Sequence, residues 1–202
     1  MVMDFFDSVR DTLSGLGNAV GFQTYSGYRS DLNAEQNRQA WLNHVYSYAK
    51  KWQAQTGIPA EVYVAIMASE TNYGKAGSYF GIKGTGPAGS TNYATHEIIN
   101  GQRVDLVDQF AAYDNPDQAH EHFIKLISTA PRYAQAWQHF QQTVDWQGLL
   151  QGMNAAGYAT DPNWASMIAG LTNTVAKSLG VEAIGAGASV PAAGAGPSYR
   201  LR

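Results

Sequence analysis

One glutamate, Glu70, stands at the end of a stretch in which nearly every residue is apolar. Residues 62–68 are apolar on all sides of a helix, which predicts a buried helix with Glu70 in its last turn and Gly74 as a left-handed stop. The helix dipole and the apolar surroundings both disfavour an ionised carboxylate, so we expect a raised pKa at Glu70. Such a carboxyl could donate a proton as a general acid. The pattern also fits a partly exposed glutamate at a helix end.

A second carboxylate is expected on a β-hairpin. Asn100-Gly101 is the strongest two-residue hairpin signal. A turn there sets cross-strand pairs, which are Ile99 with Gln102, Glu97 with Val104, Thr95 with Leu106 and His96 with Asp105. Cleavage of a glycosidic bond needs an acid and usually a second carboxylate, a role that Glu97 suits. Asp105 and Asp108 are alternatives, and Glu97 could also be a solvated surface charge.

Other chemistries are less well supported. The two imidazoles of His120-Glu121-His122 diverge on a helix, so we expect a solvated polar face rather than a metal site. There is no cysteine and no Gly-x-Ser-x-Gly elbow, which disfavours an acyl-enzyme. The glycine-rich residues 84–89 lack the Lys-Ser/Thr ending of a phosphate loop. We therefore predict no metal and no organic cofactor.

Aromatic side chains are frequent near the expected loops and turns. Tyrosine and tryptophan can stack on sugar rings while their polar ends bind hydroxyls, although ordinary packing remains the alternative for most of them. The aromatic residues near loops are Tyr73, Tyr79, Phe80, Tyr93, Tyr113, Tyr133 and Tyr158. The tryptophans expected in the core, on helical stripes, are Trp41, Trp52 and Trp164.

Composition narrows the class of protein. The 202 residues carry a net charge of -3, so no basic footprint indicates nucleic acid as a partner. No segment reaches the roughly 18 uninterrupted apolar residues of a membrane span, so we expect no stable membrane insertion. The first residues lack the basic run and apolar core of a secretory signal. We therefore expect synthesis in the cytoplasm and delivery by another agent if the substrate lies outside.

Helical periodicity dominates, interrupted once by the hairpin. Helices are expected over residues 31–55, around Glu70, after Asp114 and in three further segments up to Gly180. The predicted class is α+β, predominantly helical, with a small antiparallel hairpin. We predict an amphipathic helix and linker over residues 1–30, one domain over residues 31–182 and a flexible Gly/Ala-rich tail over residues 183–202. The first helix could pack on the domain or dock on a membrane surface or a partner.

Short motifs follow one another in a fixed order over about residues 35–180. The motifs are Ala68-Ser-Glu-Thr-Asn-Tyr-Gly-Lys75, Tyr79-Phe-Gly-Ile-Lys-Gly84, Thr95-His-Glu97, Asn100-Gly101, Phe110-Ala-Ala-Tyr113, Pro131-Arg-Tyr133 and Ala156-Gly-Tyr-Ala-Thr-Asp-Pro162. This ordered series resembles glycoside hydrolase family 73, the bacterial peptidoglycan N-acetylglucosaminidases, which include the hydrolase domain of the flagellar rod-assembly protein.

The resemblance implies a lysozyme-like fold with a sugar-binding cleft between a helical lobe and a small β-lobe. It implies cleavage between N-acetylglucosamine and N-acetylmuramic acid, with Glu70 as general acid. Glu97 falls on the family's second carboxylate, which activates water or supports attack by the substrate's acetamido group. Tyr133 and Tyr158 fall on tyrosines associated with the cleft.

We also assign Tyr73 and Phe80 to substrate binding. Thr71-Asn72-Tyr73 departs from the family pattern, which implies an altered subsite, and residues 84–91 form a shorter loop than in many members.

The sequence is compatible with several biological settings. Peptidoglycan strands are the expected partner, with a virion protein or an immunity protein as a further one. The expected setting is phage-mediated lysis or wall penetration, with action on the cell wall after delivery. Alternatives are a wall-degrading effector of a secretion system, a lytic transglycosylase, or a non-catalytic module that binds the wall or builds a virion.

Overall fold

The computed structural model describes residues 29–75, 78–99, 102–182 and 184, with the side chains of residues 95–99, 102 and 103 left out. The predicted helix near the N-terminus and the Gly/Ala-rich tail lie outside the described residues. The division into three segments therefore stays a prediction.

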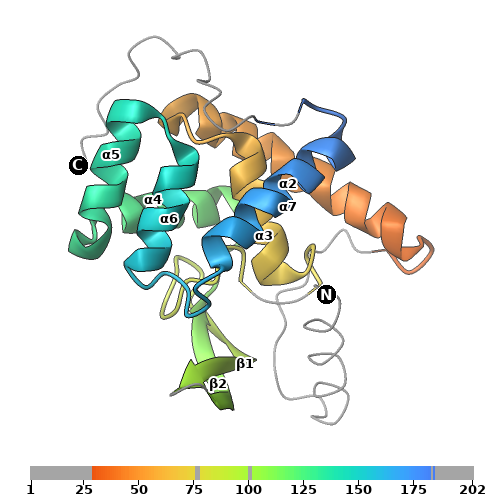
Figure 1. The fold of residues 1–202 in the computed structure, drawn as a ribbon. Coiled ribbons are helices and arrows are strands. Elements are labelled where there is room, and N and C mark those ends of the chain that lie inside the picture. The colour runs from red at the N-terminus through yellow and green to blue at the C-terminus, as the bar shows by residue number, and fades with distance from the viewer. Residues whose placement is uncertain (1–28, 76–77, 100–101, 183, 185–202) are drawn as a thin grey trace.

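Helices form the body of the molecule, and a hairpin projects from one end of it (Figure 1). The helices are α2 (Ala34–Thr56), α3 (Ala60–Thr71), α4 (Pro116–Thr129), α5 (Ala134–Thr143), α6 (Trp146–Ala155) and α7 (Trp164–Leu179), with a 3-10 turn, η1 (Pro131–Tyr133), before α5. Side-chain caps begin several of them: Asn33 starts α2, Asn115 starts α4 and Asp145 starts α6. The predominantly helical α+β class is confirmed.

Helix α3 forms the centre of the core, packed between α2 and α7. Its residues from Ala60 to Ala68 are all buried, as expected for a segment that is apolar around its whole circumference. Glu61 is the charged residue in this buried run, and its carboxylate accepts a 2.7 Å hydrogen bond from the Tyr46 hydroxyl. The three tryptophans predicted to be core, Trp41, Trp52 and Trp164, are all buried.

The hairpin consists of β1 (Ser90–Ile99) and β2 (Gln102–Ala111), paired antiparallel. All four predicted cross-strand pairs are confirmed, including Glu97 opposite Val104, while the turn residues lie outside the described part of the chain. At the base of the hairpin, the amide of Ala111 donates to the carbonyl of Ile82, and the amide of Gly84 donates to that of Gln109, both at 2.8 Å. The loop after α3 therefore anchors the hairpin to the helical body.

The end of α3 differs from the prediction. The left-handed run begins at Asn72 (φ 46°) and continues through Tyr73 (57°) to Gly74 (82°), whereas the sequence indicated Gly74 alone. The Thr71 hydroxyl stabilises this turn, since it donates to the Met67 carbonyl at 2.6 Å and accepts from the Gly74 amide at 2.9 Å. Glu70 still lies in the last turn, as predicted.

The prediction of a solvated polar face around His120 is wrong. His120 is 0% exposed and lies among the rings of Trp52, Tyr63 and Phe80. Its Nδ1 hydrogen bonds the Pro116 carbonyl at 2.7 Å, and burial lowers its pKa to about 4, so it is a neutral core residue. The position was readable from the sequence, because His120 shares the apolar stripe of α4 with Pro116 and Phe123.

Candidate active site

Glu70 is half-buried in the last turn of α3, where three other segments approach it. Burial raises the pKa of its carboxyl from an ordinary value of 4.5 to about 7, which confirms the predicted direction. The cause is loss of solvent around the charged form. At neutral pH the carboxyl is therefore divided between its protonated and ionised forms.

Trp164, the first residue of α7, directs its indole N–H at this carboxyl and favours the ionised form, in opposition to burial. The approach falls short of full hydrogen-bond geometry: among the described residues, no acceptor satisfies Nε1 of Trp164, which is buried. Nε1 of Trp164 is thus a nearby donor that makes no full hydrogen bond to Glu70.

Gly81 packs directly against Glu70. A Cβ at this position would lie 2.8 Å from Cδ of Glu70 and closer still to Oε2, well inside van der Waals contact. Gly81 also has φ +61°, in the left-handed region that side chains rarely adopt. Only glycine fits both the backbone conformation and the space, so the loop after Tyr79 forms one wall of the site.

Tyr158 holds that loop in place from the opposite side. Its hydroxyl donates a 2.6 Å hydrogen bond to the carbonyl of Phe80, the residue before Gly81. Its ring lies 4.9 Å from that of Trp164, between centroids. Burial, and then the charge of Glu70, raise the pKa of the Tyr158 phenol well above its usual range, so it stays neutral.

Two of the aromatic residues assigned to substrate binding lie in the core instead. Phe80 and Tyr133 are each 0% exposed, so neither ring offers a surface to a saccharide. Phe80 stacks on Phe123 at 4.5 Å between centroids, and Tyr133 packs 6.2 Å from Tyr158. Both rings pack against aromatic rings from other segments, and the sequence around each loop gives no sign of these contacts.

Tyr73 is half-buried on the left-handed turn after Glu70. The Arg38 guanidinium lies 4.7 Å from the centre of its ring, and Trp41 meets it edge-on at 5.8 Å. These contacts fix the ring and leave part of it exposed. Of the four aromatic residues assigned to substrate binding, Tyr73 and Tyr158 are only partly buried. Tyr73 is close to Glu70 in the chain, and Tyr158 is close to it in space.

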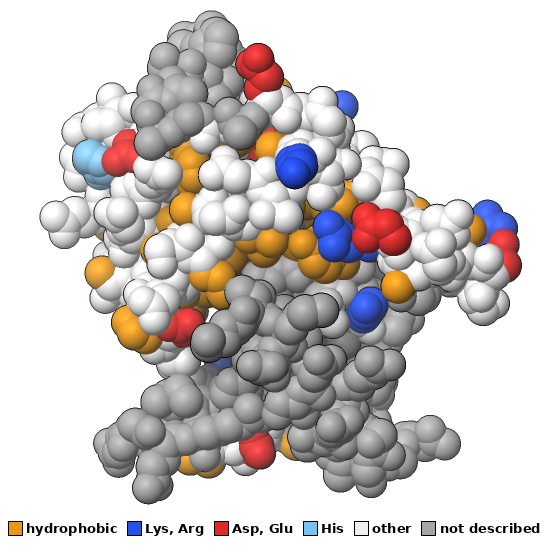
Figure 2. Space-filling model, turned by 45° about the vertical axis from the view of Figure 1, so that its right-hand side comes forward, with side chains coloured by type: hydrophobic (Ala, Val, Ile, Leu, Met, Phe, Trp, Pro, Cys, Tyr) orange, Lys and Arg blue, Asp and Glu red, His pale blue; other side chains and the backbone are white. Residues whose placement is uncertain are grey.

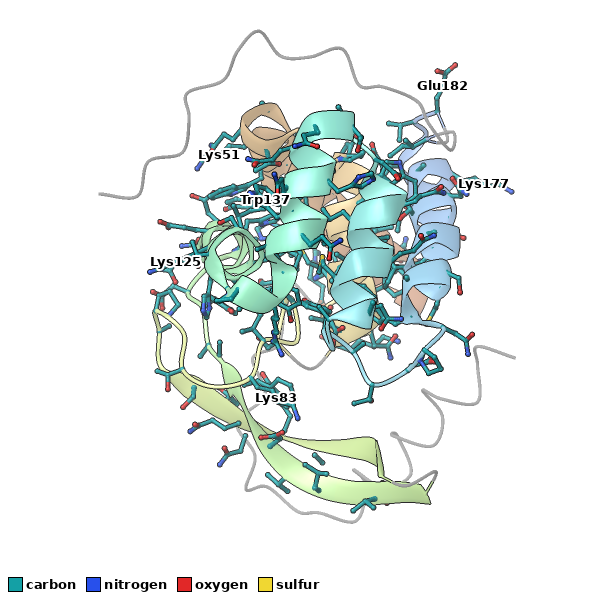
Figure 3. All side chains as sticks on the ribbon, turned by 60° about the vertical axis from the view of Figure 1, so that its left-hand side comes forward. Lys51, Lys83, Lys125, Trp137, Lys177 and Glu182 are labelled. Atoms are coloured by element: carbon teal, nitrogen blue, oxygen red, sulfur yellow. The ribbon has the colours of Figure 1, made fainter. Side chains whose placement is uncertain are left out.

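For Glu97, the predicted second carboxylate, the structure describes only the backbone. Glu97 lies opposite Val104 in the hairpin, and its side chain lies outside what the structure describes. Asp108, an alternative for this role, forms a 2.6 Å ion pair with Lys83, and the lysine lowers the pKa of that carboxyl. Figure 3 shows Lys83 at the junction between the helical body and the hairpin. Asp105 is exposed.

Three further features of the described residues concern metal ligands, membrane-spanning helices and exposed hydrophobic side chains. No three His, Cys, Asp or Glu side chains in the described ranges converge as metal ligands would, and no helix there is both long and apolar enough to cross a bilayer. Figure 2 shows a band of hydrophobic side chains across one face, with few charges along it.

Sequence reasoning missed two residues at the site. Gly81 was read only as part of a motif, although a glycine flanked by Phe80 and Ile82 in a loop is a signal for a special backbone angle. Trp164 was placed correctly in the core, but its contact with Glu70 joins segments 94 positions apart, which no local pattern shows.

A mainly helical body with a small antiparallel hairpin is the arrangement of the lysozyme-like peptidoglycan hydrolase domains. The chain belongs to the glucosaminidase family, described as mannosyl-glycoprotein endo-beta-N-acetylglucosaminidase, which it matches over residues 46–177.

Its relatives and structural neighbours agree with this class. The peptidoglycan hydrolase FlgJ of Salmonella typhimurium is 30% identical over 150 residues, covering 67% of this chain and 46% of that protein. A peptidoglycan hydrolase mutant from Sphingomonas sp. A1 is 30% identical with a TM-score of 0.58, over 70% of this chain and 97% of that one. An N-acetylmuramoyl-L-alanine amidase from Staphylococcus aureus shares the fold alone, with 16% identity, a TM-score of 0.60 and coverage of 79% and 50%. The chain spans less than half the length of the curated relatives it matches.

Proposed function

We propose that this protein hydrolyses the glycan strand of peptidoglycan between N-acetylglucosamine and N-acetylmuramic acid, with Glu70 as general acid. The observation that carries the proposal is the position of the Glu70 carboxyl at the end of a buried helix and against the Gly81 backbone, where burial raises its pKa to about 7. A carboxyl with this pKa keeps a transferable proton at neutral pH. The named activity of the Sphingomonas and Salmonella relatives supports peptidoglycan as the substrate.

In this mechanism Glu70 protonates the oxygen that leaves with the departing sugar. The bond between that oxygen and the anomeric carbon breaks, and water supplies the new hydroxyl. Gly81 leaves the carboxyl no room to turn away on its side, which favours one orientation for proton transfer.

We assign the second carboxylate to Glu97. The backbone of Glu97 pairs with Val104 in the hairpin, and Tyr93, on the same strand, is buried. Asp108 is less suitable because Lys83 already binds it. Glu97 would activate water or support attack by the acetamido group of the substrate.

Tyr73 and Tyr158 are the proposed substrate contacts. Neither residue is fully buried, and each is oriented by packing, Tyr73 by Arg38 and Tyr158 by Trp164. A fixed aromatic ring can stack on a sugar with little loss of conformational entropy. Phe80 and Tyr133 support these rings from the core.

Product analysis tests the reaction. Purified peptidoglycan digested with the wild-type protein should release fragments with reducing N-acetylglucosamine ends, detected by mass spectrometry. Anhydro-muramic ends would instead establish lytic transglycosylase chemistry on the same fold. Binding to wall sacculi without any new chain ends would establish a non-catalytic module that binds the wall or builds a virion.

We further propose that the protein acts on the wall after delivery, in phage lysis or as a secreted effector. The wall as site of action follows from the proposed substrate. The protein directed across the inner membrane by a fused secretory leader should lyse cells, whereas the same protein kept in the cytoplasm should not. Equal lysis in both cases would contradict dependence on delivery.

A further inference from the structure

Three buried tryptophans keep an indole N–H that no acceptor satisfies among the described residues: Trp41, Trp146 and Trp164. A buried donor without a partner costs free energy, so each such group calls for an explanation. Trp164 differs from Trp146 because its N–H is directed at the carboxyl of Glu70.

We propose that Trp164 is a positioning residue whose indole N–H holds the Glu70 carboxylate once that group has given up its proton. The inference rests on the proposed role of Glu70 as the acid. A neutral carboxyl is a weak acceptor, and the present approach of the two groups is not a full hydrogen bond. A carboxylate attracts the same N–H about twice as strongly.

The surrounding contacts keep the indole fixed, so the carboxyl is the partner that moves. Trp164 is 3% exposed, and its ring packs on Tyr158 at 4.9 Å. Tyr158 is held in turn by its 2.6 Å bond to the Phe80 carbonyl, next to Gly81, which packs against Glu70. The carboxyl thus lies between the Gly81 backbone and the waiting donor.

The step balances without any further reactant. The O–H bond of Glu70 breaks, its proton bonds to the leaving oxygen, and the electron pair stays on the carboxylate. The indole N–H then bonds that carboxylate and lowers its energy as the charge develops. The attacking water loses a proton, which restores Glu70 for the next cycle.

Few other groups on the described elements influence this titration. Tyr158 faces Glu70 directly, and behind it lie Tyr133, Tyr113 and the Arg132 guanidinium. Burial raises the pKa of all three phenols, so they stay neutral through the working pH range. The side chain of Glu97 is not among the described groups.

The indole proton of Trp164 offers a readout that does not require catalysis. In a ¹H–¹⁵N spectrum of the whole protein, its resonance should shift with pH with a midpoint of about 7, the pKa of Glu70. The shift should vanish in Glu70→Gln, and the Trp146 resonance should not follow it. A Trp164 resonance that stays constant while Glu70 titrates would overturn the proposal.

A kinetic comparison gives the functional test. Trp164→Phe keeps an aromatic ring, although a smaller one, and removes the donor, and Trp146→Phe makes the same change at a buried indole on α6. Trp164→Phe should move the alkaline limb of kcat/KM upward by about one pH unit, because the ionised form loses a hydrogen bond. Trp146→Phe should leave the limb in place.

The two possible failures are separable. If Glu70→Gln loses activity but Trp164→Phe leaves the alkaline limb unmoved, Glu70 is the acid and Trp164 does not position it. If Glu70→Gln keeps wild-type activity, the proposed function fails, and the indole titration alone decides whether the two side chains are coupled.

Discussion

At the scale of single residues, Glu70 is balanced between its two charge states by neighbours that oppose one another. Burial favours the protonated carboxyl, while the Trp164 N–H favours the carboxylate. Gly81 prevents the carboxyl from relaxing towards the loop. Burial therefore keeps a proton on Glu70 near neutral pH, as the proposed role of general acid requires.

Activity should therefore fall on the alkaline side as Glu70 loses its proton. We expect kcat/KM on soluble glycan fragments to decline above pH 7, with a midpoint near the Glu70 pKa of about 7. The measurement is a pH–rate profile in buffers of constant ionic strength. An alkaline midpoint near pH 10 would point to a different acid.

Gly81→Ala should damage both folding and activity. The new Cβ would clash with the Glu70 carboxyl, in addition to the cost of a positive φ. Gly180→Ala is the matched control, since it has φ +67° and open space around the added methyl. Urea unfolding should show Gly180→Ala destabilised by about 1 kcal/mol and Gly81→Ala by more than that. Equal losses would contradict the close contact with Glu70.

At the scale of elements, the loop after α3 connects Glu70, the proposed acid, to the hairpin. Its residue Gly81 packs on Glu70, and its neighbours Ile82 and Gly84 extend the backbone pairing of β2. Lys83 adds the ion pair to Asp108 at the same junction. A displacement of the hairpin is therefore transmitted to the wall of the site.

Lys83→Met should affect substrate binding more than stability. Lys83 and Lys51 are both 53% exposed at the side chain, and each forms one short ion pair, so Lys51→Met is the matched control away from the hairpin. Exposed pairs contribute roughly 0–1 kcal/mol, so both variants should unfold almost as the wild type does. Only Lys83→Met should raise KM several-fold with little change in kcat. A similar KM for both variants would exclude a role for this junction.

Local patterns predicted the elements better than the contacts between them. The apolar run before Glu70 and the Asn-Gly signal act over a few residues, and the place of Glu70 in the last turn of α3 and the hairpin register agree with them. Phe80 was misplaced because its ring packs against His120 and Phe123 of α4, which lie about forty positions further along the sequence. The resemblance implies that Glu70 is the acid, but the approach of Trp164 to Glu70 depends on packing of α7 against α3.

At the scale of the whole molecule, two buried groups make stability depend on pH in opposite directions. Glu70 binds more protons in the folded state between its ordinary pKa of 4.5 and about 7, so its contribution to the free energy of unfolding falls as pH rises. His120 has a pKa of about 4 when folded and 6.5 ordinarily, so its contribution rises with pH. The two effects nearly cancel over the same window.

Glu70→Gln should expose the His120 effect. The free energy of unfolding of this variant, relative to the wild type, should increase between pH 4.5 and 7 by about 2–3 kcal/mol, since one pKa unit corresponds to about 1.4 kcal/mol. Urea unfolding followed by tryptophan fluorescence at both pH values measures this. Glu121→Gln, at an exposed position on α4, should track the wild type. A constant difference between Glu70→Gln and wild type would contradict the raised pKa.

The most direct test of Glu70 as the acid is the rate at which the Glu70→Gln protein releases reducing ends from purified peptidoglycan at pH 6. Glutamine keeps the shape of the side chain but has no proton to transfer, so the rate should fall by about 10²–10⁴-fold. Glu121→Gln should retain the wild-type rate. A Glu70→Gln protein that is folded and works at the wild-type rate would contradict the assignment.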